Sequence, residues 1–437
     1  MGPIGAELRG GFALEDARHF LLDSPREELV ALFGRVAHTE TGLLFLVQAA
    51  ETAPEDMVWR DDEGLHWMPE LTRTWTHRAE DADQGVVVLH AHHHAGPVAL
   101  SPTDNDTCTR ILGHLGAVIP SQAHGYGVVG DTAISAWFSW RGETLPWVQM
   151  TTVACPIRKW AENPVSVPPP APPMSRQVAA ITDVGQARMA AATVALIGVG
   201  GAGSTVADQL AHMGVGTMVL CEADILKDVN LSRQTGAGPS NIGALKADVA
   251  AAAIRHANPA LAVVIIPERF PGPRSHLALR TADVIVSCVD SAAARHEINK
   301  FGRRFLIPVI DVGATIRRSA ADELQMIVGH TARILPDGAC LECEGLTSPG
   351  LREAELDGHG VPYWEREDNI GVPQIMSING LLASAAVTEV LRLIAGLSED
   401  HQSRHWRYEA LEGELYAREP VSSRCAVCGL LGRGDEY

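Results

Sequence analysis

A short run of glycines constrains this chain more than any other feature. Gly198-Val199-Gly200-Gly201-Ala202-Gly203 stands directly after the apolar run 194–197. Glycines between a buried strand and a helix let backbone N–H groups approach a phosphate at the helix N-terminus. Such turns also occur in dinucleotide sites and in tight turns that bind nothing. The run therefore predicts a strand-turn-helix unit and leaves its ligand open.

Strands and helices alternate around this turn. Apolar runs predict strands over 193–198, 217–221, 262–266 and 282–288, and longer periodic stretches predict helices over 203–212 and 242–257. Alternation at this spacing favours an α/β fold with a doubly wound, mostly parallel Rossmann-like sheet. We expect this domain to occupy residues 174–437.

A proline-rich stretch over 161–173 divides the chain. Dense prolines remove backbone donors and favour extended polyproline II geometry, so we expect a semi-rigid linker. Residues 1–160 before it contain short apolar runs, such as 43–47 and 86–89, among helical segments. They predict a second, smaller α/β domain.

The composition excludes several function classes. The chain has 437 residues, 46% of them hydrophobic, which is enough for two cores. With 35 basic and 53 acidic residues the net charge is −18, which argues against a nucleic-acid groove. The N-terminus lacks the pattern of a signal peptide, and the apolar run 380–394 is interrupted by Glu389 and Arg392. We expect a cytoplasmic protein that binds neither nucleic acid nor membrane.

Polar residues downstream of the glycine turn indicate its ligand. In chain order they are Glu222 and Asp224, the stretch Asn230-Leu231-Ser232-Arg233-Gln234, Lys246, and Cys288-Val289-Asp290. This order resembles the ThiF/MoeB/ubiquitin-activating (E1-like) adenylyltransferase family over roughly residues 174–437. Arg176-Gln177 and Gly185-Gln186 resemble its lead-in, and Glu222 stands where the family has a first aspartate. A dehydrogenase would not need the N-L-x-R-Q stretch and the lysine.

The resemblance implies ATP-dependent adenylation of a carboxylate, with Mg²⁺ as cofactor. Negative charge builds on phosphate oxygens in this reaction, so cations and a metal-bound carboxylate stabilise the transition state. Asp224 is then expected to hold the ribose hydroxyls, Asp290 to hold Mg²⁺, and Arg176 to reach the ATP of a second subunit in a homodimer. The phosphates would be contacted by Asn230, Arg233 and Lys246. The expected nucleotide-binding set is Gly198, Gly200, Gly201, Gly203, Asp224, Asn230, Arg233, Gln234, Lys246 and Asp290.

Two C-x-x-C pairs, Cys340/Cys343 and Cys425/Cys428, predict a metal site. Four thiolates in a tetrahedral array form a closed structural Zn²⁺ site, and the family commonly carries such a pair. Because the protein fills every ligand position, we expect a role in stability and none in catalysis. Unbound thiols or a redox pair are the alternative.

The resemblance to ubiquitin-activating enzymes implies a thioester cysteine between residues 312 and 371, where the only cysteines are Cys340 and Cys343. Cys221 and Cys288 stand at strand ends and are expected to be packed as small apolar residues. The sequence leaves open whether the reaction stops at an acyl-adenylate.

The N-terminal region contains a second motif. His90-Ala91-His92 follows the apolar run 86–89, and Ser101 and Asp104 follow after a short loop. The pattern resembles the JAMM (MPN/JAB) metalloprotease family. The resemblance implies a catalytic zinc on His90, His92 and Asp104, an oxyanion-stabilising Ser101 and a general base at Glu27. Alternatives are His94 as a ligand in place of His90, Glu28 as the base, and a solvated histidine loop without metal.

Together the two motif sets predict an enzyme that acts on the glycine-ended tail of a ubiquitin-like protein. The first domain would free or remove the tail, the second would adenylate it, and a conjugating-enzyme-like protein would be a further partner. Activation of a sulfur-carrier protein for thiamin- or molybdopterin-type cofactor biosynthesis is one alternative. A scaffold that binds such a protein without chemistry is another.

Overall fold

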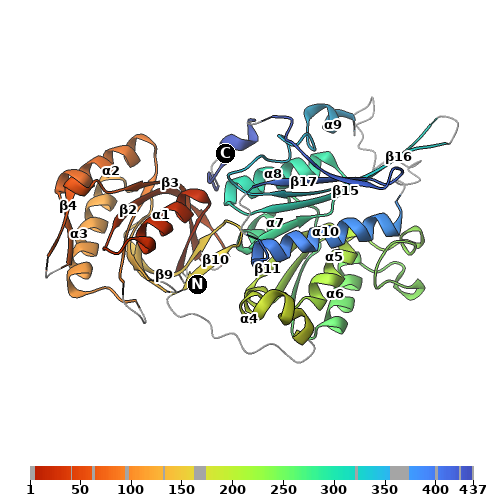
Figure 1. Cartoon of the computed structure of the whole chain (residues 1–437), viewed down its shortest axis with the longest axis horizontal. Helices are drawn as coiled ribbons and strands as arrows, with labels where there is room; N and C mark the ends of the chain where they lie inside the picture. The colour runs from red at the N-terminus through yellow and green to blue at the C-terminus, as the bar shows by residue number, and fades with distance from the viewer. Residues whose placement is uncertain are drawn as a thin grey trace. The chain divides into compact units, whose positions relative to one another are not determined.

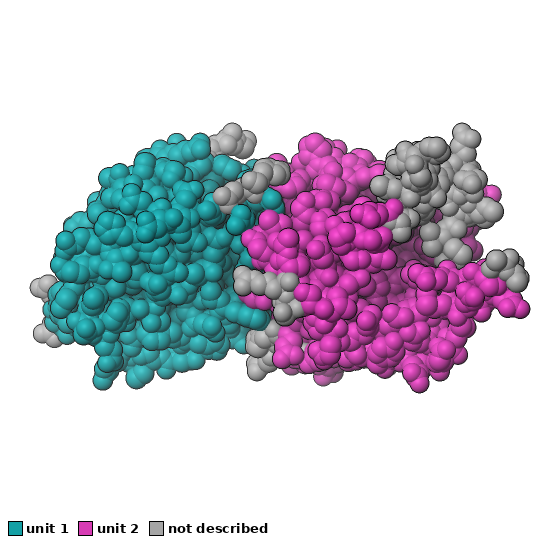
Figure 2. All heavy atoms as spheres, turned by 90° about the horizontal axis from the view of Figure 1, so that it is seen from above, with its two compact units in different colours: residues 1–166, 304–306, 431–437 teal, residues 167–303, 307–430 magenta. Residues whose placement is uncertain are grey.

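A computed structural model describes two compact units in the chain. The described residues are 5–40, 42–61, 64–93, 98–130, 133–161, 174–319, 323–354, 374–398, 402–422 and 425–435. Unit 1 comprises residues 1–166, 304–306 and 431–437, and unit 2 comprises residues 167–303 and 307–430 (Figures 1 and 2). Most of the predicted linker, residues 162–173, lies outside the described residues, as does His94.

Unit 1 is built on a sheet that closes on itself. Its strands follow the order β1-β3-β2-β6-β7-β8-β9-β10, and β1 also pairs with β9, which closes a barrel-like ring. The strands are β1 (Gly5–Gly10), β2 (Leu29–His38), β3 (Gly42–Thr52), β6 (Gly85–Ala91), β7 (His124–Val129), β8 (Ile134–Trp140), β9 (Glu143–Thr152) and β10 (Arg158–Ala161). Closure was not part of the sequence prediction, which gave only a small α/β domain.

Alternation along the strands divides the core of unit 1 into two layers. Val30 and Leu32 of β2 pack on the same side as α1 (Phe12–Asp23), whereas Leu29 and Ala31 face α2 (Pro69–Asp81) and α3 (Pro102–Val118). Successive side chains of a strand point to opposite faces. His90 therefore lies on the α3 side of β6, with Val86 and Val88.

A hairpin of β4 (Val58–Asp61) and β5 (Gly64–Trp67) completes unit 1, preceded by a short 3₁₀ turn (Glu55–Met57). Arg60 of the hairpin donates to the Glu27 carbonyl at 2.6 Å and to the Glu28 carboxylate at 3.0 Å. The hairpin is thus attached to the segment that leads into β2.

Unit 2 contains a mixed sheet in the order β13-β12-β11-β14-β15-β16-β17-β18. The strands are β11 (Thr193–Ile197), β12 (Thr217–Cys221), β13 (Ala262–Ile266), β14 (Val284–Ser287), β15 (Val309–Arg318), β16 (Leu324–Ile334), β17 (Arg404–Glu409) and β18 (Glu414–Arg418). The helices are α4 (Ser175–Ala191), α5 (Gly201–His212), α6 (Lys246–Ala257), α7 (Pro273–Ala278), α8 (Ala292–Phe305), α9 (Pro349–Ala354) and α10 (Met376–Ile394).

The parallel half of this sheet has the predicted doubly wound order. From β11 the chain moves outward to β12 and β13 through α5 and α6, then returns to β14 and moves the other way to β15 through α8. Right-handed crossovers place helices of the two directions on opposite faces. The order reverses between β11 and β14, and ligands of open α/β sheets bind at the carboxyl ends of strands at such a point.

The sequence analysis missed strands of unit 2 and misplaced the start of α6. The antiparallel strands β16 to β18 were not predicted. The helix expected from residue 242 begins at Lys246, because Gly243 has a φ of +88° and a 3₁₀ turn (Pro239–Asn241) precedes it. The strand positions 217–221 and 262–266 agree with the prediction.

Among the described helices, α10 is long and apolar enough to cross a membrane by length and composition. Its residues Leu382, Ala386 and Val390 are buried, and it packs on α5, β15 and β16. Figure 1 shows it running alongside α5. A core helix of a globular unit has this burial.

Candidate functional site

A cleft of about 610 Å³ opens at the point where the strand order of unit 2 reverses. The glycine turn after β11 and the turn after β14 both line it. Of the predicted nucleotide-binding residues, the cleft brings together Gly198, Gly200, Gly201, Asp224, Asn230, Arg233, Gln234, Lys246 and Asp290. Gly203 lies behind this surface, within α5.

Close backbone contacts explain the glycines of the turn. Gly198 has a φ of +85°, a conformation that side-chain-bearing residues rarely adopt. A Cβ at Gly203 would lie 2.1 Å from the Gly198 carbonyl oxygen, and one at Gly201 would lie 2.4 Å from the Asn379 amide nitrogen. A Cβ at Gly200 would meet nothing within 4 Å. Gly203 therefore lets α5 start directly against the strand end.

The peptide of Val199 is held from both sides. Its N–H donates to Glu222 Oε2 at 2.9 Å, and its carbonyl accepts from Gln234 Nε2 at 2.7 Å. The other oxygen of Glu222 accepts from the Asp224 N–H at 2.9 Å. Glu222 thus joins the glycine turn to the loop after β12. This gives a structural reason for a glutamate where the family has a first aspartate.

Asp224 bridges two cations at the cleft. Its Oδ2 lies 3.0 Å from Lys246 Nζ, and its Oδ1 lies 2.8 Å from an Arg269 guanidinium nitrogen. Burial raises the pKa of Asp224, but Lys246 and Arg269 outweigh it and hold that pKa below its usual value. Asp224 is thus ionised and can accept hydrogen bonds from sugar hydroxyls.

Arg233 faces Asp290 across the cleft. Burial lowers the pKa of Arg233, and the Asp290 carboxylate partly offsets this. Arg233 Nη1 also donates to the Val229 carbonyl at 3.0 Å. The Asn230 side chain accepts from the Lys227 N–H at 3.0 Å, which stabilises the loop that carries Arg233. The cleft therefore contains both the Arg233 guanidinium and the exposed Asp290 carboxylate.

Arg176 is exposed on α4 and is not among the residues that line the cleft. Its neighbour Gln177 donates to Gln186 and to the Met213 carbonyl. Gln177 and Gln186 thus attach α4 to the end of α5. The role of Arg176 stays a prediction.

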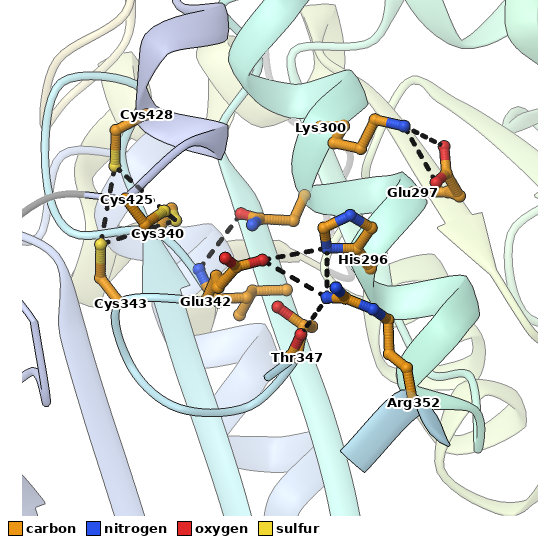
Figure 3. A network of polar contacts seen from close by, with 12 residues as sticks. His296, Glu297, Lys300, Cys340, Glu342, Cys343, Thr347, Arg352, Cys425 and Cys428 are labelled. Atoms are coloured by element: carbon orange, nitrogen blue, oxygen red, sulfur yellow. Dashed lines mark hydrogen bonds and ion pairs between the residues drawn. The ribbon is translucent and has the colours of Figure 1, made fainter. Parts of the chain in front are cut away.

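The four predicted metal-binding cysteines meet in one cluster (Figure 3). Their sulfur atoms lie 3.4 Å (Cys340–Cys425), 3.6 Å (Cys343–Cys428) and 3.8 Å (Cys340–Cys343 and Cys425–Cys428) apart. A tetrahedral Zn²⁺ with Zn–S bonds of about 2.3 Å requires sulfurs about 3.8 Å apart. The donor set and spacing therefore fit a structural zinc ion.

Polar contacts attach the first cysteine pair to α8. The Leu341 N–H donates to Asn299 Oδ1 at 3.1 Å, and Glu342 lies 3.2 Å from His296 Nδ1. Figure 3 shows Arg352 reaching the same His296 and Glu342. The loop that carries Cys340 and Cys343 is thus joined to the helix that follows the Asp290 turn.

Three of the four remaining described cysteines are poor nucleophiles. Burial raises the pKa of Cys221 to about 12 and that of Cys108 to about 11. Burial, together with the Asp311 carboxylate, also raises the pKa of Cys288. Thiols react as thiolates, so these three side chains are unfavourable for a thioester.

Unit 1 brings His90, His92 and Asp104 together. The two Nε2 atoms lie 3.1 Å apart, and Asp104 lies 3.1 Å from His90 and 3.5 Å from His92. With metal–nitrogen bonds of about 2.0 Å, tetrahedral Zn²⁺ ligands lie about 3.3 Å apart. The three side chains therefore fit a zinc ion with an open position. His93 is exposed, and its ring nitrogen pairs with the Arg26 carbonyl.

Ser101 has a structural role beside this cluster. It is the N-cap of α3: its hydroxyl accepts from the Asp104 N–H, and Asp104 Oδ2 accepts from the Ser101 N–H at 2.8 Å. The S-x-x-D spacing is therefore also that of a capping box.

Tyr126, which the sequence analysis missed, supports the cluster from β7. Its hydroxyl donates to Asp104 Oδ1 at 3.2 Å and lies 3.4 Å from His90 Nδ1. Burial and the Asp104 carboxylate raise the pKa of Tyr126 well above its usual value. Burial also raises the pKa of Asp104, but hydrogen bonds with His90 and Ser101 outweigh it and hold that pKa low.

The structure separates the two candidate bases. The Glu28 carboxylate accepts from Ser24 at 2.9 Å and pairs with Arg60 at 3.0 Å. The Glu27 carboxylate is close enough to Tyr126 to contribute to its raised pKa. Glu27 is thus linked electrostatically to the tyrosine that supports the cluster, whereas Ser24 and Arg60 hold the Glu28 carboxylate.

Other residues of the unit 2 cleft were also missed, among them Glu268, Arg269, Arg295, Gln374 and Asn379. They come from elements far apart in the sequence, and no short motif connects them. Of these, only Arg295 lies close in sequence to a predicted site residue: it follows Asp290 by five positions, in the first turn of α8.

The model of the ThiF family matches residues 174–429, which is more than half of the chain. Escherichia coli (strain K12) sulfur carrier protein ThiS adenylyltransferase is 33% identical over 253 residues, 56% of this chain and 89% of the relative. The SAMP-activating enzyme E1 of Haloferax volcanii is 28% identical, over 56% of this chain and 83% of the relative.

Mouse adenylyltransferase and sulfurtransferase MOCS3 is 29% identical over 61% of this chain, and the match spans only 57% of that protein. A crystal structure of E. coli MccB with succinimide aligns over 60% of this chain and 75% of its own at 19% identity, with a TM-score of 0.48. The family match begins at residue 174 and says nothing about residues 1–173.

We expect Gly203→Ala to lower the free energy of unfolding of unit 2 by about 2–3 kcal/mol, because the new methyl group would overlap the Gly198 carbonyl. Gly200→Ala is the matched control and should cost about 1 kcal/mol or less. Urea unfolding of both variants measures the difference. Equal stabilities would show that the close approach at Gly203 is absent.

We expect one zinc ion per chain at the four-cysteine cluster, with an affinity that falls as pH falls, because thiol protons compete with the metal. Burial raises the pKa of Cys425 to about 11 in the metal-free chain, so protons leave when metal binds at neutral pH. Metal analysis across pH 5–8 measures this. Cys428→Ser should lose the ion, whereas Cys221→Ser should retain it; equal metal content in both would contradict the assignment.

Proposed function

The chain belongs to the ThiF family, and on that premise we propose that unit 2 uses ATP to adenylate the C-terminal carboxylate of a small, glycine-ended protein. The observation that carries this proposal is the cleft, which gathers Asp224, Arg233, Lys246 and Asp290 beside the glycine turn. Asp224 and Arg233 come from the connection between β12 and α6, Lys246 is the first residue of α6, and Asp290 follows β14. Each has the charge that a magnesium nucleotide requires in its place.

The geometry suggests how the side chains divide the work. The N-terminus of α5 and the glycine turn present backbone N–H groups to phosphate oxygens. Arg233 and Lys246 offset the charge that develops while the carboxylate attacks the α-phosphate and pyrophosphate leaves. Asp290 is exposed in the cleft lining and would bind a Mg²⁺ ion, which would neutralise the pyrophosphate. Asp224 accepts from the ribose hydroxyls.

The class of protein substrate is proposed from the relatives. Their names describe activation of SAMP, adenylylation of the sulfur carrier ThiS, and combined adenylyl and sulfur transfer. We propose a ubiquitin-like or sulfur-carrier protein, without preferring one. The raised pKa values of Cys221 and Cys288 favour an acyl-adenylate that is passed to a thiol or amine on another protein, such as a conjugating-enzyme-like partner. Arg176 in its proposed role requires a homodimer.

A second candidate function belongs to unit 1. The cluster of His90, His92 and Asp104 favours zinc-dependent hydrolysis of a peptide or isopeptide bond. A zinc ion in the cluster would activate a water molecule. Glu27 would accept the proton of that water, and the Ser101 hydroxyl would donate to the oxyanion. Such an activity would process the same glycine-ended protein that unit 2 activates.

We expect Asp290→Asn to reduce ATP–pyrophosphate exchange with the cognate carrier at least about 100-fold, as loss of a transition-state charge contact does. Binding of the carrier should persist. Asp248→Asn, which removes an equal charge from an exposed position of α6, is the control and should exchange at the wild-type rate. ATP–pyrophosphate exchange that persists in Asp290→Asn would exclude this adenylation site. If the wild-type protein shows no exchange with any glycine-ended carrier, a scaffold function would be favoured.

For unit 1 we expect Glu27→Gln to lose cleavage of a glycine-ended protein carrying a C-terminal extension while it retains its zinc. Glu28→Gln should keep activity, because Ser24 and Arg60 already occupy that carboxylate. His92→Ala should lower zinc content by one equivalent per chain. Mass spectrometry measures the cleavage, and metal analysis measures the zinc content. Wild-type protein that holds zinc only on its cysteines would contradict the proposal.

A further inference from the structure

Arg295 joins three parts of unit 2 at the floor of the cleft. It lies in the first turn of α8 and lines the cleft. Its Nη2 donates to the Val289 carbonyl at 2.6 Å and to the Val312 carbonyl at 3.3 Å. Its Nε lies 3.0 Å from Asp311 Oδ2. Val289 immediately precedes Asp290, so the guanidinium is hydrogen-bonded to the peptide group that links Val289 to Asp290.

Asp311 anchors this arginine from inside the sheet. It is fully buried on β15, where it accepts from Ser287 Oγ of β14 at 2.6 Å and pairs with His330 Nε2 of β16 at 2.7 Å. Burial raises the pKa of Asp311, but Arg295 and His330 outweigh it, so the carboxylate is ionised. Three neighbouring strands thus hold one charged group in place.

Gly313 makes room for the assembly. A Cβ at this position would lie 2.5 Å from Arg295 Nη2 and 2.5 Å from the His330 ring. Any larger residue would push the arginine away from the two carbonyl groups. The missing side chain at Gly313 and the charged pair therefore belong to one arrangement.

The energetics of buried ion pairs favour a role beyond stability. Removing two charges from water is costly, and well-packed apolar residues of similar volume often stabilise a core as much or more. The Arg295–Asp311 pair lies between α8 and β15, and Arg295 contacts the turn after β14 that carries Asp290. Fixing this turn determines where the Asp290 carboxylate can meet a metal ion.

We propose that Arg295, held by Asp311 and His330, is a positioning residue that sets the Asp290 turn for binding the metal–nucleotide complex. This inference rests on the proposed adenylation function and deepens it. It says that Arg295, Asp311 and His330, which are not among the predicted nucleotide-binding residues, determine where Asp290 binds the metal ion. Arg295 acts on the metal through the Val289 peptide. It is a positioning residue, distinct from the phosphate-contacting role proposed for Arg233 and Lys246.

Arg295→Lys tests the proposal with the smallest change. Lysine keeps the positive charge beside Asp311, so the buried carboxylate stays paired, but one ammonium group cannot also reproduce the fork onto Val289 and Val312. The Mg²⁺ concentration that half-saturates ATP binding should rise about 10–100-fold, as it does when groups that orient a ligand are lost. Affinity for ATP in EDTA should change less than about 2-fold.

The measurement is calorimetric titration of the full chain with ATP over a Mg²⁺ series, repeated with Mn²⁺ and followed by the electron paramagnetic resonance signal of the bound ion. No carrier protein is required. Arg255→Lys, an exposed arginine on α6, is the matched control. Asp311→Asn should give the same metal shift if it folds, and Ser287→Ala a smaller one.

Three outcomes are decisive. A shift in metal dependence alone, in Arg295→Lys but not in Arg255→Lys, supports the proposal. Unchanged metal dependence, or an equal loss of ATP affinity in EDTA, overturns it, since the latter would make Arg295 a direct nucleotide ligand. Wild-type chain that binds no ATP with either metal would overturn the proposed function and this inference together.

Discussion

The approach of the Gly203 backbone to the Gly198 carbonyl is the contact on which the rest of unit 2 depends. It brings the start of α5 directly onto the end of β11, so the helix N–H groups face the carboxyl edge of the sheet. Once this turn is fixed, Glu222 and Gln234 can hold the Val199 peptide from both sides. Glu222 is close to Asp224 in the sequence, and Gln234 directly follows Arg233. The contacts of Glu222 and Gln234 with Val199 therefore also place the segments that carry Asp224 and Arg233 relative to the glycine turn.

The parallel half of unit 2 could be predicted because its signals are local. Apolar runs, glycine spacing and polar residues at strand ends are all read within a few positions, and Asp224, Arg233, Lys246 and Asp290 do gather in one cleft. The network of Arg295, Asp311 and His330 could not be predicted in this way. It joins α8, β15 and β16 through side chains that meet only because of the order of the strands in the sheet. In the sequence, a buried aspartate such as Asp311 cannot be told from an aspartate at the end of a strand.

Unit 1 shows the same division between local and non-local signals. The H-x-H and S-x-x-D motifs were evident in the sequence, and the structure brings His90, His92 and Asp104 within zinc-binding distance of one another. The same spacing also produces a helix cap, so Ser101 and Asp104 have a structural explanation that needs no metal. Closure of the sheet through β1 and β9 depends on pairing between the two ends of the unit, which no periodicity reveals.

The four-cysteine cluster also affects how unit 2 is held together. Cys340 and Cys425, 85 positions apart, lie side by side, and α10 and the β17–β18 hairpin fall between them. A metal ion there closes a large loop, which removes on the order of 4 kcal/mol of chain entropy from the unfolded state if it acts as a disulfide would. A bound metal ion would hold the two ends of that loop together, so the two pieces of a backbone cut within the loop would stay joined through the metal.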